Sequence, residues 1–132
     1  MSEMILPYTL SGEVIRGNRI GRKLGFPTAN IPLRDDTVAD GVYAVRAEVD
    51  GTIRNGVANA GSRPTVTDRA ERFLEVYLFG FDGDLYGKTL RVELVQFLRE
   101  EKKFDSVDAL RRQIEQDKTD AELFLKNQRR FF

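Results

Sequence analysis

The segment GRKLGFPTAN, which ends at Asn30, combines residue types that can bind phosphate and a metal ion. Its glycines, together with Gly17 just before it, permit positive φ and a close approach of the backbone to a ligand. Successive amide N–H groups in such a loop can form an anion-binding nest. Arg22 adds positive charge, while Thr28 and Asn30 supply a hydroxyl and an amide oxygen. A glycine-rich connection between two strands is the simpler interpretation, because an isolated glycine-rich loop is a weak signal.

Glu75 is the only charged residue in the apolar stretch FLEVYLF. Large apolar residues occupy both faces of this stretch if it is a strand, so we expect the strand to be largely buried. A buried carboxylate is costly unless it is paired, bound to a ligand or functional. Desolvation would disfavour its ionised form and make it a better general base, whereas an ion pair with one of the arginines would make its role structural. The sequence leaves both interpretations open.

Two further segments contain polar residues that could cover a site. ANAGSRPTVTD, from Ala58 to Asp68, is rich in turn-forming residues, and an ordinary crossover loop is its simpler interpretation. LREEKKFDS contains Arg99, Lys102 and Phe104, which could bind a planar anionic or aromatic ligand. The alternative is a solvated run of charges in which Phe104 packs against the start of a following helix.

The lack of cysteine and histidine restricts the chemistry that this protein can perform. The sequence of 132 residues contains neither residue. Disulfides, thiolate zinc sites and cysteine nucleophiles are therefore excluded, as are imidazole metal ligands and the Ser-His-Asp arrangement. Any reaction must use carboxylates, hydroxyls, lysine, arginine, backbone amides or a metal ion with oxygen ligands. Ligation by oxygen alone favours Mg²⁺, Mn²⁺ or Ca²⁺.

The charge balance argues against two classes of partner. Lys plus Arg and Asp plus Glu both number 21, so the formal net charge is zero. A protein that binds duplex nucleic acid or an anionic membrane usually has a basic excess.

The N-terminal MSEMILPYTL has too short an apolar run for a signal peptide, and no segment approaches the ~20 apolar residues of a membrane span. We therefore expect a cytoplasmic, monomeric protein that binds neither nucleic acid nor membrane.

Most of the chain has the pattern of antiparallel strands. Apolar residues alternate from Tyr43 to Val49 and again after Asp50-Gly51, and alternation interrupted by Asp-Gly is a strong hairpin signal. FLEVYLFGFDGDLYG repeats this arrangement, with a turn expected at 82–84. Further strands are expected at 10–15, 73–81 and about 88–97.

The last quarter of the chain changes to helical spacing. FDSVDALRRQIEQD has apolar residues at the helical period, and Asp105 or Ser106 can cap the start of this helix. Thr119 and Glu122 fit a capping box, which would begin a second short helix. The sequence therefore predicts two helices in succession.

These patterns predict one domain of the mainly β class over residues 1–132. The strands would form a closed antiparallel β-barrel over about residues 8–98, and the α-helices would follow over about residues 105–127. No repeat, low-complexity tract or interdomain linker interrupts the sequence. In such a barrel, GRKLGFPTAN is the connection that follows the opening strand.

Taken together, these segments resemble the riboflavin kinase family. GRKLGFPTAN, ANAGSRPT, LEVYLF with the following DLYG, and LREEKKFDS occur in the family's order, from about Tyr8 to Leu125. The resemblance implies a closed six-stranded antiparallel β-barrel of Greek-key type with a helical C-terminal part. It also implies transfer of the γ-phosphoryl group of ATP to the 5′-hydroxyl of riboflavin, which gives FMN and ADP, with Mg²⁺ or another divalent ion as cofactor.

In many bacteria this module is the C-terminal half of a bifunctional flavin synthetase, so the chain is expected to be part of, or partnered with, an FMN adenylyltransferase. The chain itself is expected to lack that half, because it has no histidine for the half's nucleotide motif.

The resemblance also implies roles for individual residues. Glu75 falls on the family's catalytic carboxylate, and Thr28 and Asn30 fall where the family contacts Mg²⁺ and the nucleotide phosphates. The implied ATP-binding residues are Gly17, Arg22, Thr28, Asn30 and Tyr86, and the implied flavin-binding residues are Arg99, Lys102 and Phe104.

Four positions depart from the family's usual pattern, namely Val66, Tyr77, Gly80 and Glu100. None of them removes a catalytic group, but Glu100 stands where a proline often follows the loop arginine, which leaves the stiffness of the flavin loop open. Two other functions are alternatives. One is a barrel that binds flavin or nucleotide without turnover, and the other is an OB-like barrel that binds single-stranded nucleic acid.

Overall fold

The computed structural model describes residues 4–15, 26–34, 36–64, 70–81 and 83–127. Gly17, Arg22 and Val66 lie outside the described residues. The elements are β1 (Tyr8–Glu13), β2 (Ala29–Pro32), β3 (Gly41–Val49), β4 (Thr52–Pro64), β5 (Ala70–Leu78), β6 (Thr89–Arg99) and α2 (Val107–Asn127).

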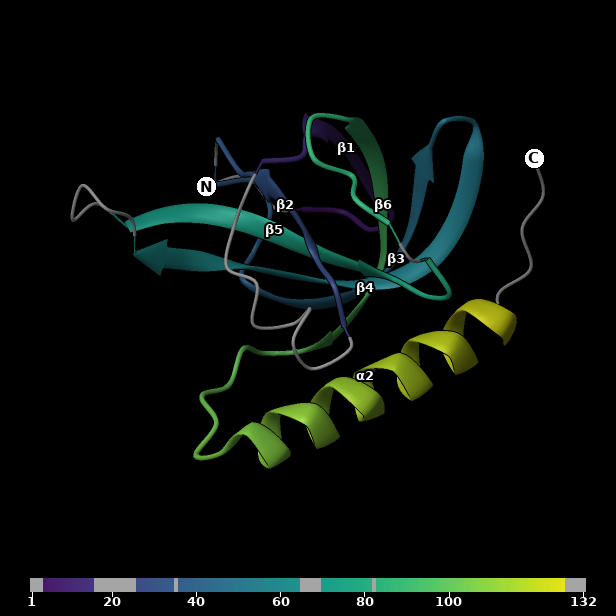
Figure 1. The fold of residues 1–132 in the computed structure, drawn as a ribbon. Helices are drawn as coiled ribbons and strands as arrows, with labels where there is room; N and C mark the ends of the chain where they lie inside the picture. Colours follow the sequence, from purple (N-terminus) through teal and green to yellow (C-terminus); the bar gives the residue numbers. More distant parts are fainter. Residues whose placement is uncertain (1–3, 16–25, 35, 65–69, 82, 128–132) are drawn as a thin grey trace.

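In the described part of the chain, six strands form one antiparallel sheet in the order β1-β6-β3-β4-β5-β2. β3, β4 and β5 are neighbours in the chain, and β6 returns to lie beside β3, which is Greek-key connectivity. The sheet curls (Figure 1), and the N–H of Ile15 donates to the carbonyl oxygen of Asn30 over 2.8 Å. The predicted mainly β fold of six antiparallel strands with Greek-key connectivity is confirmed. In the described residues it is a curled half-barrel, because β1 and β2 lie at the two edges of the sheet and only the bridge between Ile15 and Asn30 joins these edges.

Apolar side chains fill the inside of the curled sheet. On β5, Leu74, Val76 and Leu78 are buried in this inner core, and the alternate residues of the strand face the outer side. β3 is buried on both faces, because Val45 belongs to the inner core and Ala44 to a second apolar cluster beneath the helix. Since the inner side is occupied by apolar groups, a polar site on these strands has to lie on the outer side.

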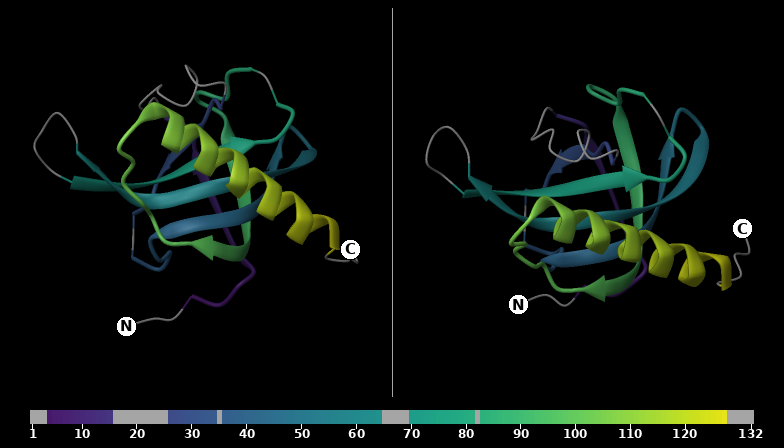
Figure 2. Two further views of the ribbon diagram at one scale, coloured as in Figure 1. Left: turned by 90° about the horizontal axis from the view of Figure 1, so that it is seen from below. Right: turned by 60° about the horizontal axis from the view of Figure 1, so that its bottom comes forward.

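The helix α2 lies across the outer face of the sheet (Figure 2). Ala121 and Leu125 are buried against Ala44, Val57 and Val95, which project from β3, β4 and β6. Among the described residues, no helix is long and apolar enough to cross a membrane.

A single continuous helix takes the place of the two that the sequence predicts. The predicted cap at Ser106 is confirmed, because its Oγ accepts a hydrogen bond from the N–H of Ala109 over 3.0 Å. Thr119 lies inside α2, and its hydroxyl donates to the carbonyl oxygen of Glu115 over 3.1 Å. A hydroxyl that bonds back to the preceding turn belongs to a helix interior. The capping-box prediction at Thr119 and Glu122 is therefore wrong.

β4 is also longer than the sequence predicts. The segment that begins at Ala58, predicted as a turn-rich loop, continues as a strand to Pro64, and it pairs with β5 over this whole stretch. Its small residues have a packing reason, since a Cβ on Gly61 would meet the carboxylate of Glu101. The loop prediction is therefore wrong as far as Pro64. β1, β5 and β6 lie within three residues of their predicted ranges.

Replacing Thr119 by alanine should stabilise the protein by a few tenths of a kcal/mol, because alanine is the better residue inside a helix. If Thr119 capped a second helix, the same change would cost about 1 kcal/mol. Ser106→Ala removes the observed cap and is the matched control, with an expected cost of about 1 kcal/mol. Urea unfolding monitored by circular dichroism measures both variants. Equal destabilisation by the two substitutions would restore the two-helix interpretation.

Candidate active site

The strand registers place one row of residues across the sheet. Asn30 of β2 lies opposite Glu75 of β5, which lies opposite Asn59 of β4. Val42 of β3 continues the row, paired with Asn59 on one side and with Arg99 of β6 on the other. Directly opposed residues of antiparallel strands point to the same face. That face is the outer one, because the neighbours of Glu75 along β5 belong to the inner core.

A cleft of about 470 Å³ lies over this row, bounded by the sheet, the segment 100–106 and the first half of α2. Five residues that the sequence predicts for the site line this cleft, namely Thr28, Glu75, Arg99, Lys102 and Phe104. A volume of ~300–1,000 Å³ is typical of small-molecule sites. The fold therefore brings residues from both ends of the chain to one cavity of suitable size.

The remaining predicted residues are placed differently. Asn30 is buried and lies opposite Glu75, but it is not among the residues that line the cleft. Tyr86 is 52% exposed on the turn before β6 and does not line the cleft. Gly17 and Arg22 are outside the described residues. The nucleotide roles of Tyr86, Gly17 and Arg22 stay predictions.

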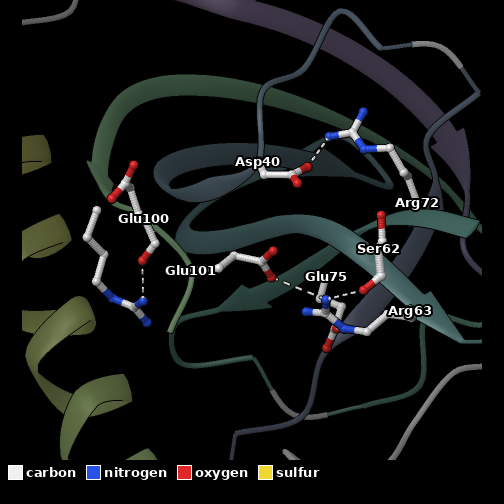
Figure 3. A network of polar contacts seen from close by, with 8 residues as sticks. Asp40, Ser62, Arg63, Arg72, Glu75, Glu100 and Glu101 are labelled. Atoms are coloured by element: carbon white, nitrogen blue, oxygen red, sulfur yellow. Dashed lines mark hydrogen bonds and ion pairs between the residues drawn. The ribbon is translucent and has the colours of Figure 1, made fainter. Parts of the chain in front are cut away.

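Arg63 of β4 joins two carboxylates beside the cleft (Figure 3). Its Nε donates to Oε1 of Glu75 over 2.8 Å, and its Nη1 donates to Oε2 of Glu101 over 3.2 Å. Nη1 also donates to the carbonyl oxygen of Ser62 over 2.8 Å. Burial lowers the pKa of Arg63, but the charges of Glu75 and Glu101 outweigh burial and raise this pKa above its ordinary value. The charged guanidinium therefore links β5 to the segment 100–106.

The ion pair settles part of the question that the sequence leaves open at Glu75. The carboxylate has Arg63 as its partner, and its side chain is 22% exposed, so the ion pair that the sequence leaves open is present. An ionised carboxylate that an arginine orients at the wall of a cleft can still accept a proton from a bound hydroxyl. Its role as a general base stays a prediction.

Arg99 attaches the end of β6 to α2. Its Nε and Nη2 donate to the two carboxylate oxygens of Asp117 over 2.8 and 2.7 Å, and the two side chains are only 17% and 6% exposed. Gln113 donates to the same carboxylate over 3.0 Å and accepts a hydrogen bond from Nζ of Lys102 over 3.0 Å. A bidentate pair of this kind is strong and geometrically specific. Both Arg99 and Lys102, predicted to bind flavin, are therefore positioned by α2.

Several residues of the cleft wall are missing from the sequence-based prediction, among them Arg63, Asn59 and Asp117. Arg63 and Asn59 lie in the segment that the sequence assigns to a loop, where no pairing partner could be inferred. The importance of Asp117 could have been recognised from the sequence. It follows Leu110 and Ile114 at helical spacing on the inward face of α2, and a carboxylate on such a face needs a partner.

The oxygen donors near Glu75 fit a metal ion that is bound together with phosphates. In the described ranges, no group of three or more acidic side chains gathers that could hold a metal ion alone. Thr28 and Asn30 supply neutral oxygens two residues apart on β2 and the chain just before it. Mg²⁺ usually takes one or two protein ligands and completes its shell with water and substrate phosphates.

Residues 4–125 match the family model described as Flavokinase: Riboflavin kinase, and the chain belongs to this family. A bifunctional riboflavin kinase/FMN adenylyltransferase of Bacillus subtilis (strain 168) is 41% identical over 94% of this chain and 40% of its own length. An RNA-binding riboflavin kinase of the same organism is 42% identical over 82% of this chain and 47% of its own length. The chain therefore spans less than half the length of these relatives.

A solved structure described as a macrolide-efflux protein from Streptococcus pneumoniae has the same fold, with a TM-score of 0.79. The two sequences are 37% identical, and the match covers 93% of this chain and 40% of the other.

Gly61→Ala should release the segment 100–106 from the sheet. A Cβ at this position would meet both carboxylate oxygens of Glu101 and push them away from Arg63, while Glu75 keeps its partner. We expect faster amide hydrogen exchange at residues 102–104. Stability should fall by no more than about 1 kcal/mol, because the lost ion pair is partly exposed.

Glu101→Gln removes the same ion pair without adding a methyl group and should give the same change in exchange. Unchanged exchange in both variants would show that the pair between Arg63 and Glu101 does not hold this segment.

Proposed function

We propose that this chain transfers the γ-phosphoryl group of ATP to the 5′-hydroxyl of riboflavin, giving FMN and ADP. Membership of the riboflavin kinase family supports this activity. The observation that carries the proposal is the cleft in which Glu75 lies between Thr28 and the segment containing Lys102 and Phe104. Phosphoryl transfer needs positioning and charge stabilisation more than covalent chemistry from the protein. A chain without histidine or cysteine can therefore perform it.

Thr28 and Asn30 are the proposed ligands on the nucleotide side. A bound Mg²⁺, or another divalent ion, would neutralise charge on the phosphates of ATP. Asn30 lies directly opposite Glu75, and neighbouring strands are ~4.8 Å apart. Phosphates held at Asn30 would therefore lie close to the proposed base. Gly17, Arg22 and Tyr86 complete the proposed nucleotide contacts on the strength of the family resemblance.

Glu75 is the proposed general base. Its carboxylate would accept the proton of the 5′-hydroxyl as the new bond to phosphorus forms, and ADP would leave on the opposite side. Arg63 contributes orientation, because its Nε holds Oε1 of Glu75 over 2.8 Å. This contact removes rotational freedom that the carboxylate would otherwise lose when the substrate binds.

The end of β6 and the segment that follows it form the proposed flavin side. Phe104 lines the cleft and can stack on a planar ring, while Arg99 and Lys102 supply positive charge. Contacts of Glu101 and Lys102 to the sheet and to α2 hold the segment over the cleft. We propose that these contacts open and re-form as flavin enters.

We further propose that an FMN adenylyltransferase consumes the product, as part of the same protein or as its partner. The Bacillus subtilis bifunctional relative combines both activities in its name, and this chain spans 40% of its length. The expected monomeric state and the expected lack of nucleic-acid binding stay predictions. The latter is open to test in particular because one relative is named an RNA-binding riboflavin kinase.

Incubation with riboflavin, ATP and Mg²⁺ should convert riboflavin to FMN with equimolar ADP, and no FAD should form. The products are separated by chromatography with fluorescence detection, and a reaction with chelator is the control. Flavin binding without FMN would identify a binding protein. FAD in the product would show that adenylyl transfer also resides in this histidine-free chain.

Glu75→Gln should lower kcat by roughly 10²–10⁴-fold, because glutamine keeps the shape of the side chain but cannot accept the proton. Stability should change by no more than about 1 kcal/mol, since the ion pair with Arg63 is partly exposed. Glu71→Gln, at an exposed position of the same strand, is the matched control and should keep normal turnover. A lower melting temperature with normal turnover per folded molecule would instead assign Glu75 a structural role.

A further inference from the structure

The side-chain oxygen of Asn59 is buried and unpaired within the described part of the protein. Oδ1 has almost no contact with solvent and finds no hydrogen-bond donor among the described residues. Asn59 also lines the cleft, from the middle of β4. Most buried side-chain polar atoms in proteins have a partner, so an exception needs an explanation.

A purely structural role does not explain this asparagine. A buried acceptor without a donor costs stability, and an apolar residue of similar size would fit the same half-buried position at no such cost. Val57, two residues earlier on the same face of β4, shows what a structural position on this face requires, because it is apolar and buried. An unsatisfied acceptor in the wall of a binding cleft is instead suited to a donor that arrives with a ligand.

The position of Asn59 in the cross-strand row indicates which ligand group it meets. It lies directly opposite Glu75, on the side away from Asn30 and toward Arg99. One strand spacing, ~4.8 Å, separates it from the proposed base. If phosphates lie at the Asn30 side, Asn59 lies on the side of the acceptor alcohol. The donors of riboflavin nearest its reacting 5′-hydroxyl are the other hydroxyls of the ribityl chain.

We propose that Asn59 accepts a hydrogen bond from the ribityl hydroxyl next to the reacting one, and so orients the 5′-hydroxyl toward Glu75. This inference rests on the proposed function, since it names a substrate contact of the same site. Asn59 then acts as a specificity-determining residue. A hydroxyl that pairs with it is favoured, while an analogue without that hydroxyl leaves the buried oxygen unpaired.

Asn59→Leu tests the proposal, with Asn55→Leu as the control at an exposed position four residues earlier on β4. We expect kcat/KM for riboflavin to fall roughly tenfold or more in Asn59→Leu, the usual worth of one hydrogen bond to a substrate. Mg-ADP affinity by calorimetry should not change, and the melting temperature should stay equal or rise. Asn59→Ala provides the same comparison with a smaller side chain. Normal riboflavin kinetics with a lowered melting temperature in both variants would overturn the proposal.

Two flavin analogues identify the hydroxyl. Wild-type protein should discriminate against 4′-deoxyriboflavin, and Asn59→Leu should lose that discrimination, because the contact is already absent. A methyl group on ring nitrogen N3 should have the same effect on both proteins. If Asn59→Leu lost discrimination only against 3-methylriboflavin, Asn59 would contact the flavin ring, and the ribityl assignment would be overturned. Flavin affinity, measured by fluorescence quenching, tests the contact independently of turnover, so failure of the proposed kinase activity is distinguished from failure of this inference.

Discussion

The register of β5 between β2 and β4 fixes the side of the sheet on which each proposed catalytic group lies. Side chains alternate along a strand, so a shift of one residue would move Glu75 into the apolar interior and expose Leu74 to the cleft. Burial of Leu74, Val76 and Leu78 opposes that shift, since each buried apolar side chain contributes roughly 1.5–3 kcal/mol. The inner core therefore orients Glu75, and with it the two asparagines that the register places opposite.

Because the inner side is filled, the cleft needs a second wall, which α2 and the segment 100–106 supply. Two ion pairs of different strength hold this wall. Arg99 and Asp117 are mostly buried, and breaking such a pair by removing one partner is strongly destabilising. Arg63 and Glu101 are about one-third exposed, where a pair contributes about 0–1 kcal/mol. The wall is thus firmly anchored at the end of β6 and readily released beside Glu75.

Local patterns in the sequence predicted β1, β3, β5, β6 and the cap at Ser106, and they singled out five residues that line the cleft, whereas β2 was not predicted as a strand. These patterns failed at positions where the residue type is explained by its place in the folded structure. Glycine is typical of turns, but Gly61 lies in a strand. A glycine is needed there because the carboxylate of Glu101 occupies the space that a Cβ would fill. Thr119 resembles a cap but lies inside a helix. The partner of Glu75 could not be inferred either, since Arg63 meets it only after two strands pair.

The charge environment of Glu75 follows from the uncharged residues on either side of it. A carboxylate directly opposite on β2 or β4 would repel Glu75 and any incoming phosphate, and a lysine there would neutralise the proposed base. Amides at both positions can form hydrogen bonds without adding charge. Among the described residues, the cation that pairs with Glu75 is Arg63, which lies four residues after Asn59 on β4 and also contacts Glu101. On the proposed opening of the segment 100–106, loss of the contact with Glu101 would change the charge balance around the arginine that orients the proposed base, and opening of the cleft would thereby be coupled to the chemistry within it.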